Sequence, residues 1–248
     1  MLSRFAMSIF SDIWCVVEDI LSLVFPPSCI ICGGEVEEEH QEICFACRQR
    51  IPMTGFLTER NNPIWNLFNF HLPIEDAGSL YWFIEDSDWR KVVHRFKYSG
   101  QWLLAKKMGG WLGREILHSD NFNNIDLIIP IPLHPLKRMW RSFNQSEYLA
   151  LGVADALGVP CDSRSVQRSR YNESQTRKRR GERWENVENI FSVRRPERLR
   201  GRHVLLVDDV LTTGATILSC ANAIYKACEG DVCISIVTLA VSKRSFSD

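Results

Sequence analysis

Two hydrophobic periodicities alternate along most of the chain. Continuous or alternating apolar runs predict strands, and apolar residues three or four positions apart predict helices. The predicted strands cover residues 78–84, 126–133, 163–167, 203–207 and 232–240. The predicted helices cover residues 88–94, 101–117, 144–157 and 215–228. Strands that alternate with helices predict an α/β fold with a mostly parallel sheet flanked by helices.

Two stretches carry neither periodicity. Residues 52–73 are expected to be irregular, with a turn signal at Asn61-Asn62-Pro63. Residues 169–185 are too rich in charged and polar side chains to form a core-facing stripe, so a mobile loop is predicted there.

The N-terminal stretch, residues 1–27, is apolar but interrupted. Acidic residues between positions 12 and 19 break it before any run reaches the length of a membrane span. Apolar positions from Ile9 to Val24 recur at helical spacing, and Pro26 ends the pattern. The stretch is predicted to be an amphipathic docking helix, packed either on its own domain or on a membrane or protein partner.

Four of the nine cysteines form two CxxC pairs, at Cys29, Cys32, Cys44 and Cys47. Four thiolates at this spacing suit a tetrahedral zinc ion, and they leave no open coordination position, so a structural zinc is predicted. No signal peptide is predicted, and the reducing cytoplasm expected for the chain favours metal binding over disulfides. A redox-active disulfide pair remains the alternative. The other five are expected in the core: Cys15, Cys161, Cys220, Cys228 and Cys233.

These patterns predict three segments. An amphipathic docking helix covers residues 1–27, a four-cysteine zinc-ribbon module covers residues 28–55, and a larger α/β domain covers residues 56–248.

Charge is unevenly distributed, although the formal net charge is zero. Residues 1–89 hold 4 basic and 14 acidic side chains, whereas residues 164–202 hold 13 basic and 5 acidic ones. The basic segment suits a phosphate-rich partner, either a small polyanion or a nucleic acid.

The sequence VLLVDDVLTTGAT places acids, hydroxyls and a glycine after a predicted buried strand. Ligands of open α/β sheets bind at the carboxyl ends of the strands, where Asp208 and Asp209 are expected. Gly214 permits a turn whose backbone N–H groups face an anion. Thr213 and Thr216 add hydroxyl donors at the N-terminus of the next helix.

A vicinal diol can donate to both carboxylates while a phosphate group occupies the glycine turn. This combination describes a ribose 5-phosphate. The alternative is a capped strand–helix turn with surface aspartates.

A second basic stretch follows the strand predicted at 126–133. Lys137, Arg138 and Arg141 are expected at the same edge of the sheet, where three cations could neutralise a pyrophosphate. The alternative is a solvated basic turn before the next helix.

The VDDVLTTGAT stretch resembles the phosphoribosyl-pyrophosphate signature of type I phosphoribosyltransferases. From about residue 20 to 242, the chain also resembles the ComF/GntX-like family of competence-associated, phosphoribosyltransferase-like proteins. The resemblance rests on five ordered motifs. They are the paired CxxC, KYSG at 97–100, PIPLHPLKRMWRSFNQS at 130–146, the spaced Gln175, Arg183, Asn186 and Phe191, and VDDVLTTGAT.

The resemblance implies a type I phosphoribosyltransferase-like fold that binds phosphoribosyl pyrophosphate with Mg²⁺. The implied ribose and 5-phosphate ligands are Asp208, Asp209, Thr212, Thr213, Gly214, Ala215 and Thr216. The implied pyrophosphate ligands are Lys137, Arg138, Arg141, Gln175 and Arg183. The catalytic roles fall to Asp208, Asp209 and Arg141.

The chain departs from the family pattern at four positions. Ser142 replaces a glycine after the arginine, and Asn172 and Lys178 replace a threonine and a leucine around Gln175. Thr212 stands where purine-salvage relatives generally carry an acid, so that position offers no carboxylate general base. Purine salvage is therefore disfavoured, and the acceptor stays open.

Two functions from different classes follow. The leading hypothesis is a cytoplasmic phosphoribosyltransferase, linked to DNA uptake, that transfers ribose 5-phosphate to an unidentified nitrogenous acceptor and releases pyrophosphate. The alternative is a non-catalytic accessory protein that senses phosphoribosyl pyrophosphate or a related nucleotide and binds single-stranded DNA or a competence-machinery protein. Regulation or docking through the zinc ribbon and first helix is a third hypothesis, and homo-oligomerisation stays open.

Overall fold

A computed structural model of the chain describes residues 28–29, 31–36, 43–84, 87, 89–90, 92–93, 95, 101–133, 143–168, 190–243 and 246. The chain divides into two compact units, Met1–Arg50 and Ile51–Asp248. The helix predicted over residues 1–27 and the loop predicted over 169–185 lie outside the described residues. The predicted boundary between residues 55 and 56 stays a prediction; Met53 forms a β-bridge with Tyr81 in the second unit.

A four-stranded parallel sheet forms the centre of the second unit, in the order β1-β6-β5-β2. Its strands are β1 (Ala77–Phe83), β2 (Leu127–Pro130), β5 (His203–Leu211) and β6 (Cys233–Ser242). Val204, Leu205, Leu206 and Val207 are each 0% exposed. A continuous apolar run is what a strand paired on both sides and covered on both faces requires. The parallel sheet predicted from the sequence is therefore confirmed.

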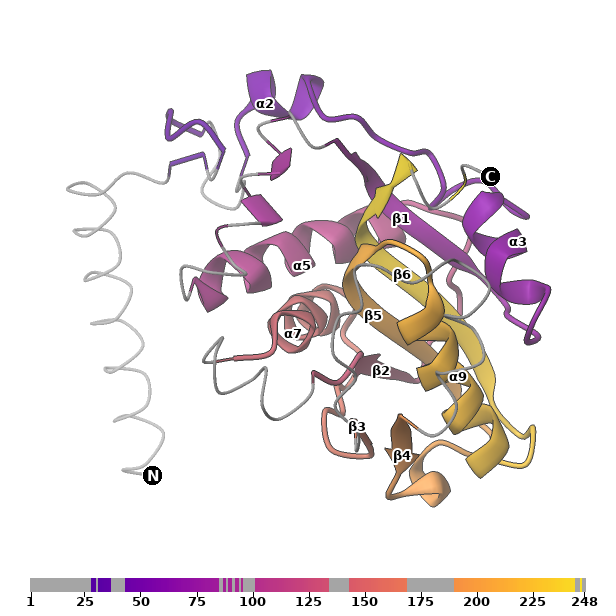
Figure 1. The fold of residues 1–248 in the computed structure, drawn as a ribbon. Coiled ribbons are helices and arrows are strands. Elements are labelled where there is room, and N and C mark those ends of the chain that lie inside the picture. Colours follow the sequence, from indigo (N-terminus) through magenta and orange to yellow (C-terminus); the bar gives the residue numbers. More distant parts are fainter. Residues whose placement is uncertain are drawn as a thin grey trace, which may run out of the picture. The chain divides into compact units, whose positions relative to one another are not determined.

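Helices cover both faces of this sheet (Figure 1). α5 (Trp102–Leu117) and α7 (Gln145–Leu157) lie on one face, and α3 (Pro63–Asn69) and α9 (Ala215–Ala227) lie on the other. The helices predicted over 101–117, 144–157 and 215–228 are confirmed within one residue at each end. Gly158 ends α7 with φ +67°, as predicted for a helix C-cap.

Glycines let α5 and α7 approach each other backbone to backbone. A Cβ atom at Gly109 of α5 would lie 2.0 Å from the carbonyl oxygen of Leu149, and one at Gly152 of α7 would lie 2.0 Å from that of Lys106. No side chain larger than hydrogen fits at either position. The crossing fixes α7 against the sheet, which matters because the first turn of α7 borders the candidate site.

α3 corrects the prediction that residues 52–73 are irregular. Asn62 is the N-cap, and its Oδ1 accepts the backbone N–H groups of Ile64 and Trp65 at 2.9 and 3.1 Å. Pro63 occupies the first helical position, where its missing N–H costs nothing. The Asn-Pro pair, which looked like a turn signal, is thus a helix start.

Substituting Asn62 should destabilise the second unit. The buried Asn62 amide also donates to the carbonyl oxygens of Phe56 and Ala77 at 3.0 and 2.7 Å, joining α3 to β1. We expect Asn62→Ala to lower the free energy of unfolding by about 2–3 kcal/mol, since it removes a cap and leaves buried acceptors unpaired. Urea denaturation measures this difference. Asn66→Ala, at an exposed position of the same helix, should change it by less than about 0.5 kcal/mol.

Two predicted strand boundaries also need correction. The strand predicted over 163–167 is β3 (Val166–Arg168), which pairs antiparallel with β4 (Phe191–Val193), a strand not predicted from the sequence. The strand predicted over 203–207 continues to Leu211, because Asp208 and Val210 pair with β6. A short 3₁₀ turn, η1 (Pro196–Arg198), links β4 to β5. The remaining predicted strands, at 78–84, 126–133 and 232–240, correspond to β1, β2 and β6.

In the first unit, the described residues surround the four paired cysteines. Cys44 is the N-cap of α2 (Phe45–Gln49), and Ser28 and Glu35 form a β-bridge that closes a tight turn over Cys29 and Cys32. Among the described residues of the whole chain, none belongs to a helix that is both long and apolar enough to span a bilayer.

Candidate active site and zinc ribbon

Gly214 shapes the turn between β5 and α9. It is buried and has φ +77°, a left-handed conformation that side chains with a Cβ rarely adopt. A Cβ at this position would also lie 3.2 Å from the side chains of Leu67 and Phe68 in α3. Gly214 is therefore required by both backbone conformation and space.

The N-terminus of α9 opens on this turn. Among the described residues, no side chain caps it, and the first N–H groups of a helix lack intrahelical acceptors. Thr213, Ala215 and Thr216 are half-buried around it, and Thr212 is exposed. Backbone donors, two hydroxyls and the positive end of the helix dipole can together bind a phosphate group here.

The two carboxylates of β5 are held in defined orientations. Asp208 Oδ1 accepts the backbone N–H of Asp209 at 2.9 Å, and Asp209 Oδ1 accepts that of Val210 at 2.6 Å. Ser146 in the first turn of α7 donates its hydroxyl to Asp208 Oδ1 at 2.7 Å. Both carboxylates are half-buried at the carboxyl end of β5. This is the arrangement that binding of a diol beside a phosphate requires.

Arg168, at the end of β3, adds a cation next to Asp208. Burial lowers the pKa of Arg168, and the negative charge of Asp208 opposes that shift. Its guanidinium carbon lies 5.6 Å from the centre of the Phe191 ring. The buried Nε has no hydrogen-bond partner among the described residues. Arg168 is thus placed to contact an anionic or polar ligand beside Asp208.

The predicted pyrophosphate ligands lie outside the described residues. Lys137, Arg138 and Arg141 fall in residues 134–142, and Gln175 and Arg183 fall in residues 169–189. The strand that precedes residues 134–142 is β2. Its carboxyl end lies beside β5 on the same side of the sheet as Asp208, since Pro130 pairs with Val207. Their roles stay predictions.

The four predicted zinc ligands come together in the first unit. The sulfur atoms of Cys29, Cys32, Cys44 and Cys47 all lie within 4.8 Å of one another. The amide of Gly34 points at Cys32 Sγ at 3.4 Å, and Gly33 takes φ +75° to close the turn. Four sulfur donors at this separation fit tetrahedral zinc and leave no position for a substrate.

The thiols differ in acidity because of their surroundings. Burial by itself raises the pKa of Cys29, but backbone N–H groups of Cys32, Cys44 and Ile31 outweigh it and lower the pKa to about 6. Burial and the neighbouring thiols raise the pKa of Cys47. The cluster is thus a set of crowded thiols whose thiolate forms would repel one another, and a divalent cation would stabilise those thiolates.

Comparison with known proteins covers both units. The sequence model of the double zinc ribbon domain matches residues 20–57, and that of the phosphoribosyl transferase domain matches residues 144–245. The DNA utilization protein YhgH of Salmonella typhimurium is 30% identical over 219 residues, which cover 82% of this chain and 93% of that protein. Competence protein F of Haemophilus influenzae is 27% identical over 215 residues, covering 80% and 90%.

The chain belongs to the ComF/YhgH competence family. The match to YhgH of Shigella flexneri is 31% identical over 138 residues, 54% of this chain. The chain thus spans 60% of the length of that relative, and the same share of YhgH of Escherichia coli. Among solved structures, adenine phosphoribosyl transferase from Trypanosoma brucei covers 68% of this chain at 13% identity and a TM-score of 0.37. At that TM-score the likeness carries no weight here.

The predicted fold class is confirmed for this ComF/YhgH family member: it has a parallel sheet, an N-terminal cluster of four cysteines and a match to the phosphoribosyl transferase domain. Of the five other cysteines, Cys220 and Cys228 are buried as predicted, whereas Cys161 and Cys233 are only half-buried. Cys15 lies outside the described residues.

Two residues beside the candidate site received no role from the sequence. Ser146 lies within the PIPLHPLKRMWRSFNQS motif, and Arg168 lies in the basic segment 164–202, directly before the predicted loop at 169–185. Both were visible as parts of motifs. The hydrogen bond from Ser146 to Asp208 was not, because the two residues are 62 positions apart.

Proposed function

We propose that this ComF/YhgH family member binds phosphoribosyl pyrophosphate with Mg²⁺ and transfers ribose 5-phosphate to a nitrogenous acceptor. The observation that carries the proposal is the junction of β5 and α9. There, two oriented carboxylates stand beside an uncapped helix N-terminus with a left-handed glycine. The phosphoribosyl transferase domain match over residues 144–245 supports the same ligand.

The ribose hydroxyls would donate to the carboxylates of Asp208 and Asp209. The 5-phosphate would then accept N–H groups from Thr213 to Thr216 and hydroxyls from Thr213 and Thr216. Ser146 would act as a positioning residue, since its hydroxyl bond holds Asp208 in place. Gly214 supplies the backbone turn that would bring the N–H groups of residues 213–216 close to the phosphate of a bound ribose 5-phosphate.

Mg²⁺ fits the oxygen donors present, since carboxylates and phosphate oxygens are the ligands it prefers. When bound with the substrate, it would supply positive charge that the pyrophosphate needs as it leaves. Lys137, Arg138 and Arg141 would add charge, and Gln175 and Arg183 would contribute from the loop. Arg168, whose charge interacts with that of Asp208, would add to this positive charge.

In the transfer, a bond forms between the acceptor nitrogen and ribose C1 as the bond from C1 to the pyrophosphate oxygen breaks. Pyrophosphate leaves with the electron pair, and the acceptor nitrogen loses a proton. Catalysis would come from positioning and from stabilisation of the cationic sugar by Asp208 and Asp209. Thr212 offers no carboxylate to remove that proton, which favours an acceptor that is already nucleophilic.

Calorimetric titration of the zinc-loaded protein with phosphoribosyl pyrophosphate and Mg²⁺ tests binding. We expect Asp208→Asn/Asp209→Asn to weaken binding at least about 100-fold, since a hydrogen bond to a charged group is worth about 1.5–3 kcal/mol. Asp155→Asn, the same change at an exposed site on α7, should leave the affinity unchanged. Equal affinity of the double variant and the unaltered protein would refute the site.

Ser146→Ala provides a second, milder measurement. It removes one contact to Asp208 without changing charge, so affinity should fall several-fold while the thermal transition persists. Pyrophosphate release, assayed across a panel of nitrogenous bases, then separates turnover from binding.

A second candidate is a non-catalytic accessory role in DNA handling. The relatives' names, DNA utilization protein and competence protein, favour it, as does the basic segment 164–202. In that case phosphoribosyl pyrophosphate would bind tightly, and no base in the panel would release pyrophosphate.

A further inference from the structure

A basic cavity lies at the end of the sheet opposite the candidate site. It has a volume of about 530 Å³, within the usual range of ligand sites, and Arg164, Arg198 and Arg202 line it. Leu127, Pro160 and Cys161 provide an apolar floor. The three arginines come from different segments: the loop before β3, η1 and the residue before β5.

This cavity is separate from the proposed phosphoribosyl pyrophosphate site. Leu127 is the first residue of β2, and Arg202 directly precedes β5, so the cavity lies at the amino ends of the strands. Asp208 lies six positions after Arg202. At about 3.3 Å per residue in a strand, the two sites are about 20 Å apart. One ligand group cannot occupy both.

Asp162 organises the cavity but does not cancel its charge. Its Oδ1 accepts the backbone N–H groups of Arg164 and Ser165 at 2.7 and 3.0 Å, and its Oδ2 accepts the Ser165 hydroxyl at 2.6 Å. Burial opposes ionisation, but these hydrogen bonds outweigh it and lower the pKa of Asp162. Arg198 is its ion-pair partner, at 3.4 Å.

The guanidinium groups of Arg164 and Arg202 remain available. Both residues are exposed, and neither guanidinium has an acceptor among the residues that the structure describes. Burial and nearby carboxylates raise the pKa of the Cys161 thiol to about 12, so the floor stays neutral. With Asp162 subtracted from three arginines, the lining carries two net positive charges.

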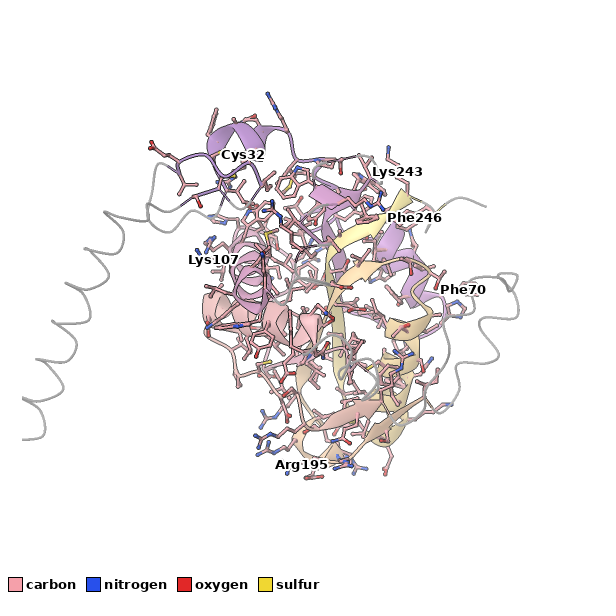
Figure 2. All side chains as sticks on the ribbon, turned by 60° about the vertical axis from the view of Figure 1, so that its left-hand side comes forward. Cys32, Phe70, Lys107, Arg195, Lys243 and Phe246 are labelled. Atoms are coloured by element: carbon pink, nitrogen blue, oxygen red, sulfur yellow. The ribbon has the colours of Figure 1, made fainter. Side chains whose placement is uncertain are left out.

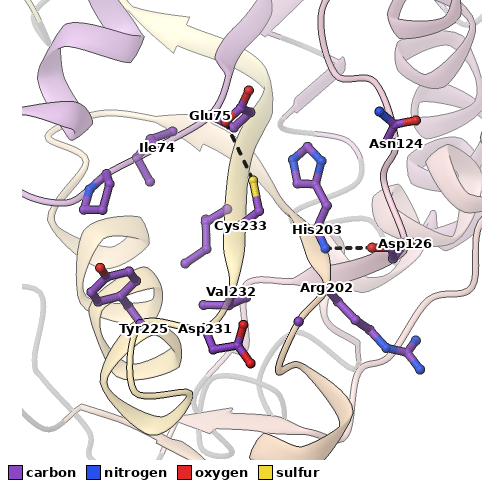
Figure 3. Close-up of a pocket in the computed structure, with 14 residues that line it drawn as sticks. Ile74, Glu75, Asn124, Asp126, Arg202, His203, Tyr225, Asp231, Val232 and Cys233 are labelled. Carbon is purple, nitrogen blue, oxygen red and sulfur yellow. Dashed lines mark hydrogen bonds between the residues drawn. The ribbon is translucent and has the colours of Figure 1, made fainter.

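A neighbouring cavity of about 640 Å³ has the opposite character (Figure 3). Glu75, Asp126 and Asp231 line it, and it shares only Arg202 with the basic cavity. Asp126 accepts the backbone N–H of His203 at 2.8 Å. The Arg202 side chain extends away from Tyr225 and Asp231 in Figure 3. An anion is therefore excluded from the acidic cavity, whereas the arginine-lined one admits it.

We infer that Arg164, Arg198 and Arg202 form a second phosphate-binding site, distinct from the β5–α9 junction. Arginine suits phosphate because its planar guanidinium group can donate two parallel hydrogen bonds to two phosphate oxygens. The phosphate is that of a nucleic-acid backbone or of a free polyphosphate. Arg194 and Arg195, both exposed between β4 and η1, add charge for a longer ligand, since the backbone N–H of Arg194 donates to the carbonyl oxygen of Ser165, next to Arg164; Figure 2 labels Arg195.

Two probes distinguish the sources: a fluorescent 20-nucleotide oligo(dT) without terminal phosphates, and inorganic tripolyphosphate. Binding is measured on the zinc-loaded full chain by anisotropy and by calorimetry, over a salt series. The test variant is Arg164→Gln/Arg202→Gln. Lys107→Gln/Lys226→Gln is the control, since it removes two exposed charges elsewhere; Lys107 lies on α5, well away from Arg195 (Figure 2).

We expect the arginine variant to weaken binding about tenfold or more, and the lysine variant to bind like the unaltered protein. For oligo(dT), the slope of log affinity against log salt should fall by about 1.4, since each single-strand phosphate contact contributes about 0.7. Loss of oligo(dT) binding identifies a nucleic-acid backbone. Loss confined to tripolyphosphate identifies a free ligand.

If the arginine variant binds both probes as tightly as the unaltered protein does, the site is overturned, and it is also overturned if the unaltered protein binds neither probe. The affinity of the same variant for phosphoribosyl pyrophosphate should be unchanged. The second phosphate site and the proposed function, which Asp208→Asn/Asp209→Asn tests, can therefore be refuted independently. Far-UV circular dichroism confirms that both variants are folded.

Discussion

Gly109→Ala should lower the free energy of unfolding of the second unit by at least about 3 kcal/mol. The added methyl group would lie 2.0 Å from the carbonyl oxygen of Leu149, and 2.8 Å from its carbonyl carbon. These are backbone atoms, so relief requires that α5 and α7 move apart. Separation would open the packed interface and shift Ser146 away from Asp208.

Gly110→Ala is the matched control, one residue further along the same helix. Its methyl group would meet only the Arg114 side chain at 3.6 Å and the Gly152 carbonyl oxygen at 4.0 Å. Because alanine is favoured over glycine in a helix interior, stability should rise by up to about 1 kcal/mol. Chemical denaturation of both variants measures the difference. Equal stabilities would contradict the close crossing of α5 and α7.

Cys47→Ser should abolish stoichiometric zinc binding by the first unit. The four sulfur atoms lie within 4.8 Å of one another, and a serine hydroxyl, which stays protonated at neutral pH, cannot replace the fourth thiolate. Structural zinc sites contribute on the order of 10 kcal/mol to folding, so residues 28–50 should become susceptible to proteolysis. Metal analysis of the purified protein and limited proteolysis measure the two effects. A chelator should reproduce them in the unaltered protein.

Cys233→Ser is the control: it removes a thiol that lies outside the four-cysteine cluster. Cys233 is half-buried at the start of β6, and its sulfur lies 3.9 Å from Glu75 Oε2. The zinc content of this variant should match that of the unaltered protein. The thermal transition of residues 51–248 should survive Cys47→Ser, since the second unit has its own core around Leu206, Ile236 and Ile224. Full zinc occupancy in Cys47→Ser would rule out the four-cysteine site.

The candidate active site and the zinc ribbon were largely predictable because their residues are close in sequence. Asp208, Asp209 and Gly214 lie within seven residues of one another, and the strand, turn and helix that contain them are local structures. The CxxC pairs likewise place two sulfurs on one turn. Alternation of apolar runs and helical stripes located β5, β6, α5, α7 and α9, because each of these elements buries a continuous face.

Prediction failed where distant contacts outweighed local signals. Asn61-Asn62-Pro63 reads as a turn, yet Asn62 starts α3 because the carbonyl oxygens of Phe56 and Ala77 hold its amide. β5 continues through two aspartates that propensity would exclude from a strand, because β6 pairs with it as far as Leu211.

By itself, then, the sequence determined the order of the four sheet strands and of α5, α7 and α9, the clustering cysteines and the glycine turn after β5, each of which rests on neighbouring residues. Only the tertiary structure decided which distant groups meet. It brought Ser146 to Asp208, brought α5 against α7 at two glycines, and brought Arg164, Arg198 and Arg202 to one cavity. Contacts of this kind depend on strand order and helix crossing, and neither is encoded in the periodicity of a single segment.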